Sequence, residues 1–118
     1  MPFLTLEYSA NLDPLDAPAL LGRLNQVIVD AGLAPELVIK ARATRFAHFR
    51  VGTSDDVRGF AHIKLSLMPG RADEVKKALA EQLMAALRDG LPVPGLVQLA
   101  VEISDIDRAG FLSTRLGE

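Results

Sequence analysis

The stretch FAHIKLSLMPGRADEVKKALAEQLMAALRDG, residues 60–90, contains a strand pattern followed at once by a helix pattern. Apolar and polar side chains alternate through residues 60–67, which is typical of a strand with one covered face. After the turn residues Pro69 and Gly70, apolar side chains recur every three or four positions up to Gly90, which predicts an amphipathic helix. Its apolar stripe comprises Val75, Ala78, Leu79, Leu83, Ala86 and Leu87.

The first half of the chain carries the same order of patterns. Residues 3–8 alternate and predict a strand. A helix follows, with Asp16 as its N-cap, Pro18 in its first turn and Gly32 as its left-handed end. The apolar stripe of this helix comprises Ala17, Leu20, Leu21, Leu24, Val27, Ile28 and Ala31.

Each half closes with a second strand. Residues 37–44 alternate after Pro35, and we expect this strand to continue to Arg50 with a bulge or kink near Arg45. Residues 97–103 alternate in the same way and predict the last strand. The shared order indicates a duplication, with repeats at about residues 2–50 and 59–104 and a tail at 105–118.

Two β-α-β units predict an α+β fold in one domain that spans residues 1–118. Because each crossover should be right-handed, we expect a four-stranded mixed sheet with two helices on one face. The helices should cover Leu4, Leu6, Ile39, Ile63, Leu65 and Val101. The opposite face should carry Phe3, Thr5, Lys40, Arg42, Phe60, His62, Gln98 and Ala100. That mixture is too apolar for a fully solvent-exposed surface and too polar for the hydrophobic core of one subunit. It predicts a subunit interface with polar pockets.

Composition excludes several classes of function. The chain has no cysteine, which excludes disulfides, thiolate metal sites and a cysteine nucleophile. Thirteen Lys and Arg against fifteen Asp and Glu give a net charge of −2, which argues against a nucleic-acid partner. Two histidines without nearby acidic partners predict no metal site. We find no membrane-spanning stretch and no signal peptide, and we expect a cytoplasmic protein.

Four motifs carry a resemblance to a known family. They are Met1-Pro2 before the first strand, the stretch EYSAN at residues 7–11, the strand IKAR at 39–42, and FAH at 60–62 leading to Gly70-Arg71. With these motifs in this order along the chain, the sequence resembles the tautomerase superfamily and, within it, the 5-carboxymethyl-2-hydroxymuconate isomerase family. The likeness runs from Pro2 to about Ile103. The second half, from Ile63, also resembles a 4-oxalocrotonate tautomerase subunit.

The resemblance implies a tautomerase-like homotrimer that uses no cofactor. It implies catalysis by the amine of an N-terminal proline, here Pro2 after removal of Met1. The substrate would be a small unsaturated 2-hydroxy or 2-oxo di- or tricarboxylate from aromatic compound catabolism. Its carboxylates would be bound by cations. Candidates for binding are Lys40, Arg42 and Arg71, and further candidates for the site are His62, Asn11 and Tyr8.

The chemistry of these residue types fits a proton shuttle. A free α-amino group has a pKa of about 7.7–8.0, and burial or nearby cations lower it toward the working range of a general base. The family pattern has arginine where this chain has Lys40, which keeps the charge and loses the two-pronged geometry. Arg42 projects from the same strand face and offers a compensating guanidinium.

Two other functions compete with this interpretation. The same base can serve decarboxylation or hydration of an unsaturated acid, and hydration would need Glu7, Tyr8 or His62 to activate water. A non-catalytic trimeric module that binds small molecules would also fit, since one fold hosts many functions.

Overall fold

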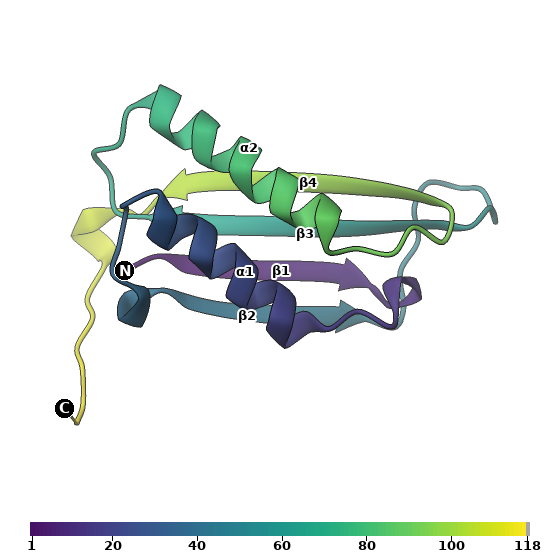
Figure 1. The fold of residues 1–118 in the computed structure, drawn as a ribbon, viewed down its shortest axis with the longest axis horizontal. Coiled ribbons are helices and arrows are strands. Elements are labelled where there is room, and N and C mark those ends of the chain that lie inside the picture. Colours follow the sequence, from purple (N-terminus) through teal and green to yellow (C-terminus); the bar gives the residue numbers. More distant parts are fainter. Residues whose placement is uncertain (118) are drawn as a thin grey trace.

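Two β-α-β units meet along the middle of one sheet in the computed structural model, which describes residues 1–117 (Figure 1). The first unit comprises β1 (Phe3–Ser9), α1 (Ala17–Asp30) and β2 (Lys40–Phe46), and the second β3 (Arg58–Leu67), α2 (Asp73–Asp89) and β4 (Leu96–Asp105). The strand order is β2-β1-β3-β4. Each unit's own strands are parallel, and β1 runs antiparallel to β3. The predicted α+β fold is confirmed.

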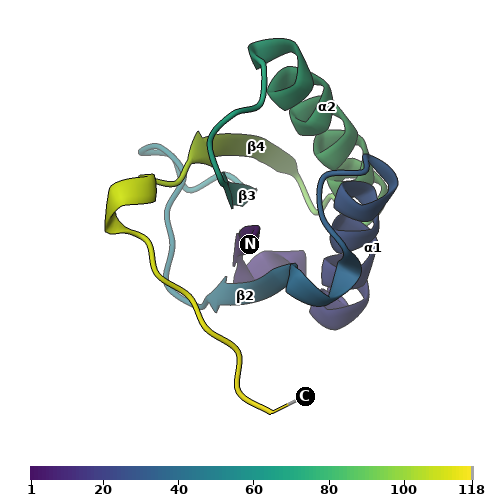
Figure 2. The same ribbon diagram turned by 90° about the vertical axis from the view of Figure 1, so that its left-hand side faces the viewer.

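Both helices lie on the same face of the sheet, as the view along the strands shows (Figure 2). They bury alternate side chains of the two central strands, among them Leu4, Leu6, Ile63 and Leu65. The helices contribute Leu20, Leu24 and Ile28 from α1 and Leu79, Leu83 and Leu87 from α2. Full burial of one such side chain contributes about 1.5–3 kcal/mol. The apolar alternation therefore decides which face the helices cover, and it leaves the other face, called the open face below, uncovered.

The ends of the helices follow local chemistry. The Asp16 carboxylate accepts a hydrogen bond from the Ala19 N–H at 3.1 Å, and Pro18 occupies the first turn of α1. Gly32 has a φ of 72°, the left-handed conformation predicted for it. Gly90 ends α2 with a φ of −97°, so this second stop does not need the left-handed region.

The prediction for the second strand was wrong at both ends. Residues Glu36–Val38 form a short 3-10 turn, and Leu37 is 65% exposed. The strand begins only at Lys40, without a kink at Arg45, and ends at Phe46. Its one neighbour in the sheet is β1, whose last residue is opposite Phe46, so residues 47–50 have no strand beside them to pair with.

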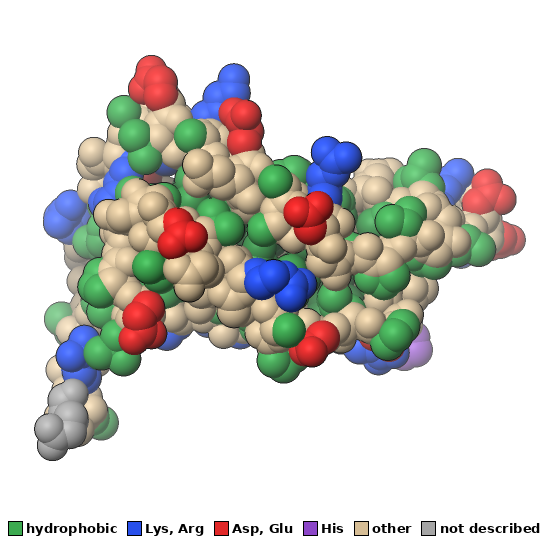
Figure 3. Space-filling model, viewed as in Figure 1, with side chains coloured by type: hydrophobic (Ala, Val, Ile, Leu, Met, Phe, Trp, Pro, Cys, Tyr) green, Lys and Arg blue, Asp and Glu red, His purple; other side chains and the backbone are tan. Residues whose placement is uncertain are grey.

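The outer surface of the helix layer carries mixed charge. Acidic and basic side chains are interspersed over it, without a large area of one sign (Figure 3). Within residues 1–117, no helix has both the length and the apolar character that crossing a bilayer requires.

A buried polar cluster closes the end of β1 that is farther from the N-terminus. The Ser9 hydroxyl, fully buried, accepts a hydrogen bond from the Phe60 N–H at 3.0 Å and donates to the Asn11 Oδ1 at 2.7 Å. The Asn11 amide donates to the Arg58 carbonyl at 2.9 Å. A Cβ at Gly59 would lie 2.8 Å from both the Ser9 and the Asn11 oxygens, so the cluster also requires a glycine there.

We predict that Asn11→Ala lowers the free energy of unfolding by about 1–3 kcal/mol, because the Arg58 carbonyl and the Ser9 hydroxyl both lose a partner. Chemical denaturation measures this effect. The matched control is Gln26→Ala, which removes an exposed hydrogen bond to Asp30 at 2.8 Å and should change stability by less than about 0.5 kcal/mol. Equal effects of the two substitutions would contradict the structural role of the cluster.

Candidate active site

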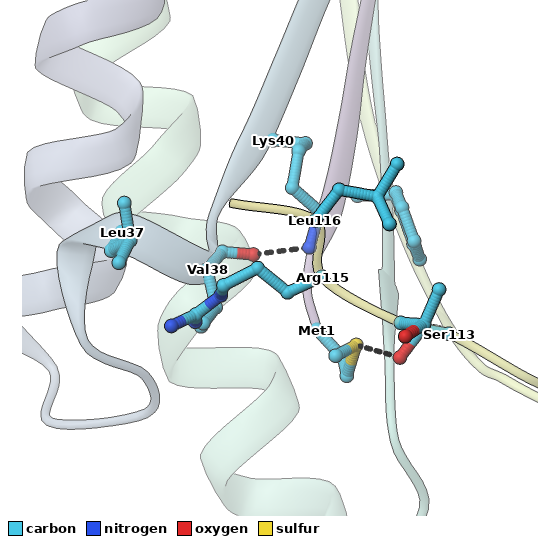
Figure 4. A pocket seen from close by; sticks show the side chains of 9 residues that line it. Met1, Leu37, Val38, Lys40, Ser113, Arg115 and Leu116 are labelled. Atoms are coloured by element: carbon cyan, nitrogen blue, oxygen red, sulfur yellow. Dashed lines mark hydrogen bonds between the residues drawn. The ribbon is translucent and has the colours of Figure 1, made fainter. Parts of the chain in front are cut away.

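A pocket of about 740 Å³ opens at the N-terminal end of β1 (Figure 4). The start of the chain, the residues around the start of β2 and the C-terminal tail form its walls. Its lining residues are Met1, Phe3, Leu37, Val38, Lys40, Ser113, Thr114, Arg115 and Leu116. The volume lies within the range of about 300–1,000 Å³ that is usual for small-molecule sites.

Pro2 does not line this pocket itself, but the sheet holds it between two residues that do, Met1 and Phe3. Its side chain is buried, and its carbonyl accepts a hydrogen bond from the Lys40 N–H at 3.1 Å. The next residue, Phe3, is opposite Lys40 in the parallel register. Strand pairing therefore brings the beginning of the chain beside the beginning of β2.

The Lys40 side chain lies on the open face next to Phe3. Its ammonium group donates to the Val38 carbonyl at 2.6 Å and lies 4.7 Å from the centroid of the Phe3 ring. Both contacts favour a cation at this position, and the second is a cation–π interaction. The charge is thus held at one place in the pocket.

Arg71 approaches the N-terminus from the helix side. It follows Gly70, whose φ of 119° is rarely adopted by other residues, and it comes just before α2. Its guanidinium is half-buried and donates to the Leu33 carbonyl, beyond the end of α1, at 3.1 Å. Arg71 therefore links the end of one helix to the start of the other at this end of the sheet.

These groups act together on the N-terminal amine. Burial lowers the pKa of the Met1 amino group below its ordinary value, and the positive charges of Lys40 and Arg71 lower it further. Each of these causes disfavours the protonated amine. The Met1 amine therefore carries a larger neutral fraction near pH 7 than an unperturbed N-terminus.

The other residues singled out from the sequence lie elsewhere in the subunit. Arg42 is exposed on the open face, opposite Thr5, and does not line the pocket. His62 is on the same face, with its Nε2 3.7 Å from a Glu102 carboxylate oxygen. Tyr8 points into the helix-covered core, 5% exposed.

Asn11 lies at the far end of β1, in the cluster with Ser9. Within one subunit, the structure thus brings Lys40 and Arg71 to the amine but not Arg42, His62, Tyr8 or Asn11. Across the described part of the chain, no three His, Asp or Glu side chains form a group that could hold a metal ion.

The sequence analysis missed the contribution of the tail to this pocket. After β4, the tail crosses the open-face side of the sheet near the N-terminus and continues past β2 (Figure 2). The Phe111 ring packs edge-on against Phe3 with centroids 6.1 Å apart, and the Ser113 hydroxyl lies 3.4 Å from the Met1 sulfur. Phe111, an aromatic residue in a polar segment, was the signal available in the sequence.

Comparison with known proteins places the chain in a family. The model of the 5-carboxymethyl-2-hydroxymuconate isomerase family matches residues 2–112. A crystal structure of a 5-carboxymethyl-2-hydroxymuconate isomerase from Deinococcus radiodurans R1 is similar, with 33% identity and a TM-score of 0.87 over 96% of this chain and 88% of that one. No curated protein matches the sequence.

Two further solved structures are similar. A 5-carboxymethyl-2-hydroxymuconate delta-isomerase has 27% identity and a TM-score of 0.75, covering 99% of this chain and 89% of that one. A fused wild-type 4-OT symmetric trimer, at 24% identity, shares the fold with a TM-score of 0.76 over 98% and 94% of the two chains. With its two β-α-β units and this family match, the chain belongs to the 5-carboxymethyl-2-hydroxymuconate isomerase family.

Proposed function

We propose that this protein is a cofactor-independent isomerase that moves a proton in an unsaturated 2-hydroxy or 2-oxo di- or tricarboxylate. Its general base would be the amine of Pro2, freed when Met1 is removed. The observation that carries the proposal is the Met1 amino group beside a small-molecule pocket, with its pKa lowered by burial, Lys40 and Arg71; the Pro2 amine would lie one residue farther along the chain. Membership in the isomerase family supports the reaction class.

The reaction needs one group that both takes and returns a proton. The neutral Pro2 amine removes the proton of the substrate's 2-hydroxyl, and the O–H electron pair becomes the carbonyl π bond of the 2-oxo product. The conjugated double bonds shift, and the protonated amine delivers the proton to the carbon that gains electron density. Lys40 and Arg71 stabilise the negative charge that develops on the 2-oxygen.

The pocket supports proton transfer over hydration. Its lining residues include no carboxylate and no histidine among residues 1–117, so the described part of the subunit offers no side-chain base there to activate water. The candidates for that role are elsewhere: Glu7 and His62 lie on the open face, and Tyr8 lies in the core. Decarboxylation would be recognised by release of carbon dioxide from a substrate panel.

We also propose that the open face associates with other copies of the chain to form a homotrimer. Three aromatic rings gather at its far end, with Phe60 packed between Phe46 and Phe49 at centroid distances of 6.2 and 6.3 Å. Apolar area of this kind beside a sheet face is typical of a protein interface. Arg42, on the same face, would then be placed to reach a site through the neighbouring subunit.

Sedimentation velocity tests the assembly. We expect the wild-type protein to sediment at three times the subunit mass, and Phe46→Asp to shift it toward monomers, because a carboxylate would be buried in the interface without a partner. The control is Gln82→Asp, which places the same charge on the exposed surface of α2 and should leave the trimer intact. A monomeric wild-type protein would contradict the proposed interface.

A second prediction concerns pH. Because a nearby cation disfavours protonation of the Pro2 amine, Lys40→Gln should raise its pKa. The rising limb of kcat/KM, which reports the neutral amine, should therefore move to higher pH. The control is Lys77→Gln, on the exposed surface of α2, which should leave the profile in place. An unshifted profile in the Lys40 variant would remove that residue from the electrostatics of the base.

The base itself is tested by Pro2→Ala, with an N-terminus verified by intact mass. We expect kcat/KM for ketonisation of a 2-hydroxydienoate, followed by ultraviolet absorbance, to fall by about 10²- to 10⁴-fold, because a mispositioned amine loses general base catalysis. Pro94→Ala, in the exposed loop before β4, is the control. Unchanged turnover in the Pro2 variant would refute the proposal, and a folded wild-type protein that turns over no dienoate would favour the binding module.

A further inference from the structure

We propose that Arg115, on the C-terminal tail, binds the substrate carboxylate that lies farthest from the Pro2 amine. The identity of the substrate class rests on the function proposed above. The inference adds a second, distal anion site to the pocket, and it gives the tail a role in selecting diacids over monoacids.

Several contacts hold the tail in place over the pocket. Asp107 caps the short turn Arg108–Gly110 by accepting from the Ala109 N–H at 3.2 Å. Phe111 then packs on Phe3, as described above. Beyond this anchor the chain continues past Met1, so that Arg115 and Leu116 lie over Val38 and Lys40 (Figure 4).

Arg115 and Lys40 both line the pocket, and Figure 4 shows the Arg115 guanidinium beside Val38, on the side away from Met1. Lys40 lies at the other side, with its ammonium hydrogen-bonded to the Val38 carbonyl and 4.7 Å from the centroid of the Phe3 ring. Among residues 1–117, no hydrogen bond or ion pair engages the Arg115 guanidinium. The pocket thus has one positive region at the amine and another on the tail.

The chemistry of the two regions differs. The Lys40 ammonium already donates to the Val38 carbonyl at 2.6 Å, and an ammonium is a point charge. A guanidinium presents a planar pair of donors that matches both oxygens of a carboxylate. Arg115 therefore supplies a two-pronged group that Lys40 cannot. A diacid would then be bound at both ends, and a monoacid at one.

A matched pair of ligands isolates the distal carboxylate. trans,trans-Muconate and sorbate share the same six-carbon diene, and only muconate carries the second carboxylate. We would measure the binding of both by titration calorimetry, using the full chain with its N-terminus verified by mass. The variants are Arg115→Gln, which removes the charge, and Arg115→Lys, which keeps it without the two-pronged geometry. Arg88→Gln, at the exposed end of α2, is the control.

We expect Arg115→Gln to weaken muconate binding by about 10-fold and sorbate binding by less than about twofold, because only muconate loses a charge-assisted contact. The muconate affinity of Arg115→Lys should lie between those of the wild type and Arg115→Gln. The Arg88→Gln control should bind both ligands as the wild type does. Equal losses for the two ligands, no loss for either, or a wild type that binds neither would overturn the inference. Binding is measured without turnover, so an inactive protein that shows the expected pattern would refute the isomerase proposal and leave the Arg115 site standing.

Discussion

The pairing of β1 with β2 is the interaction on which the rest of this site depends. The hydrogen bond from the Lys40 N–H to the Pro2 carbonyl extends the parallel ladder to the first residues of the chain. It sets Phe3 opposite Lys40 in the register. An aromatic ring and a cation therefore lie together at the pocket. Because side chains alternate along a strand, a slip of one residue would turn Lys40 toward the helices and remove it from the amine.

The N-terminal end combines burial with positive charge, and the two act in the same direction. Burial disfavours a protonated amine, and so do Lys40 and Arg71. Arg71 is held at this end by the Leu33 carbonyl, which belongs to the loop after α1. The helix layer, whose leucines cover the sheet, therefore also positions a charged group at the site.

The two β-α-β units have different chemistry where their strands begin. The start of β4 repeats the contact at the start of β2, since the Leu96 N–H donates to the Val57 carbonyl at 3.2 Å. There Leu96 stands where Lys40 stands in the first unit, and Val57 stands where Pro2 stands. Two exposed apolar residues thus replace the cation and the proline. The same backbone contact therefore holds Lys40 beside Pro2 in the first unit and an apolar pair, Leu96 and Val57, in the second.

The alternation of side chains and the spacing of leucines were enough to predict the four strands and two helices, because these are local patterns. The placement of both helices on one face of the sheet and the helix ends at Asp16 and Gly32 also followed from the sequence. The motif order was enough to predict the family. The end of β2 at Phe46 required the sheet, since a strand stops where its neighbour stops. Two features of the site also required tertiary structure: Lys40 lines the pocket and Arg42 does not, and Arg115 reaches the pocket from the tail. Neither follows from a local pattern, because both depend on contacts between segments that are far apart in the sequence.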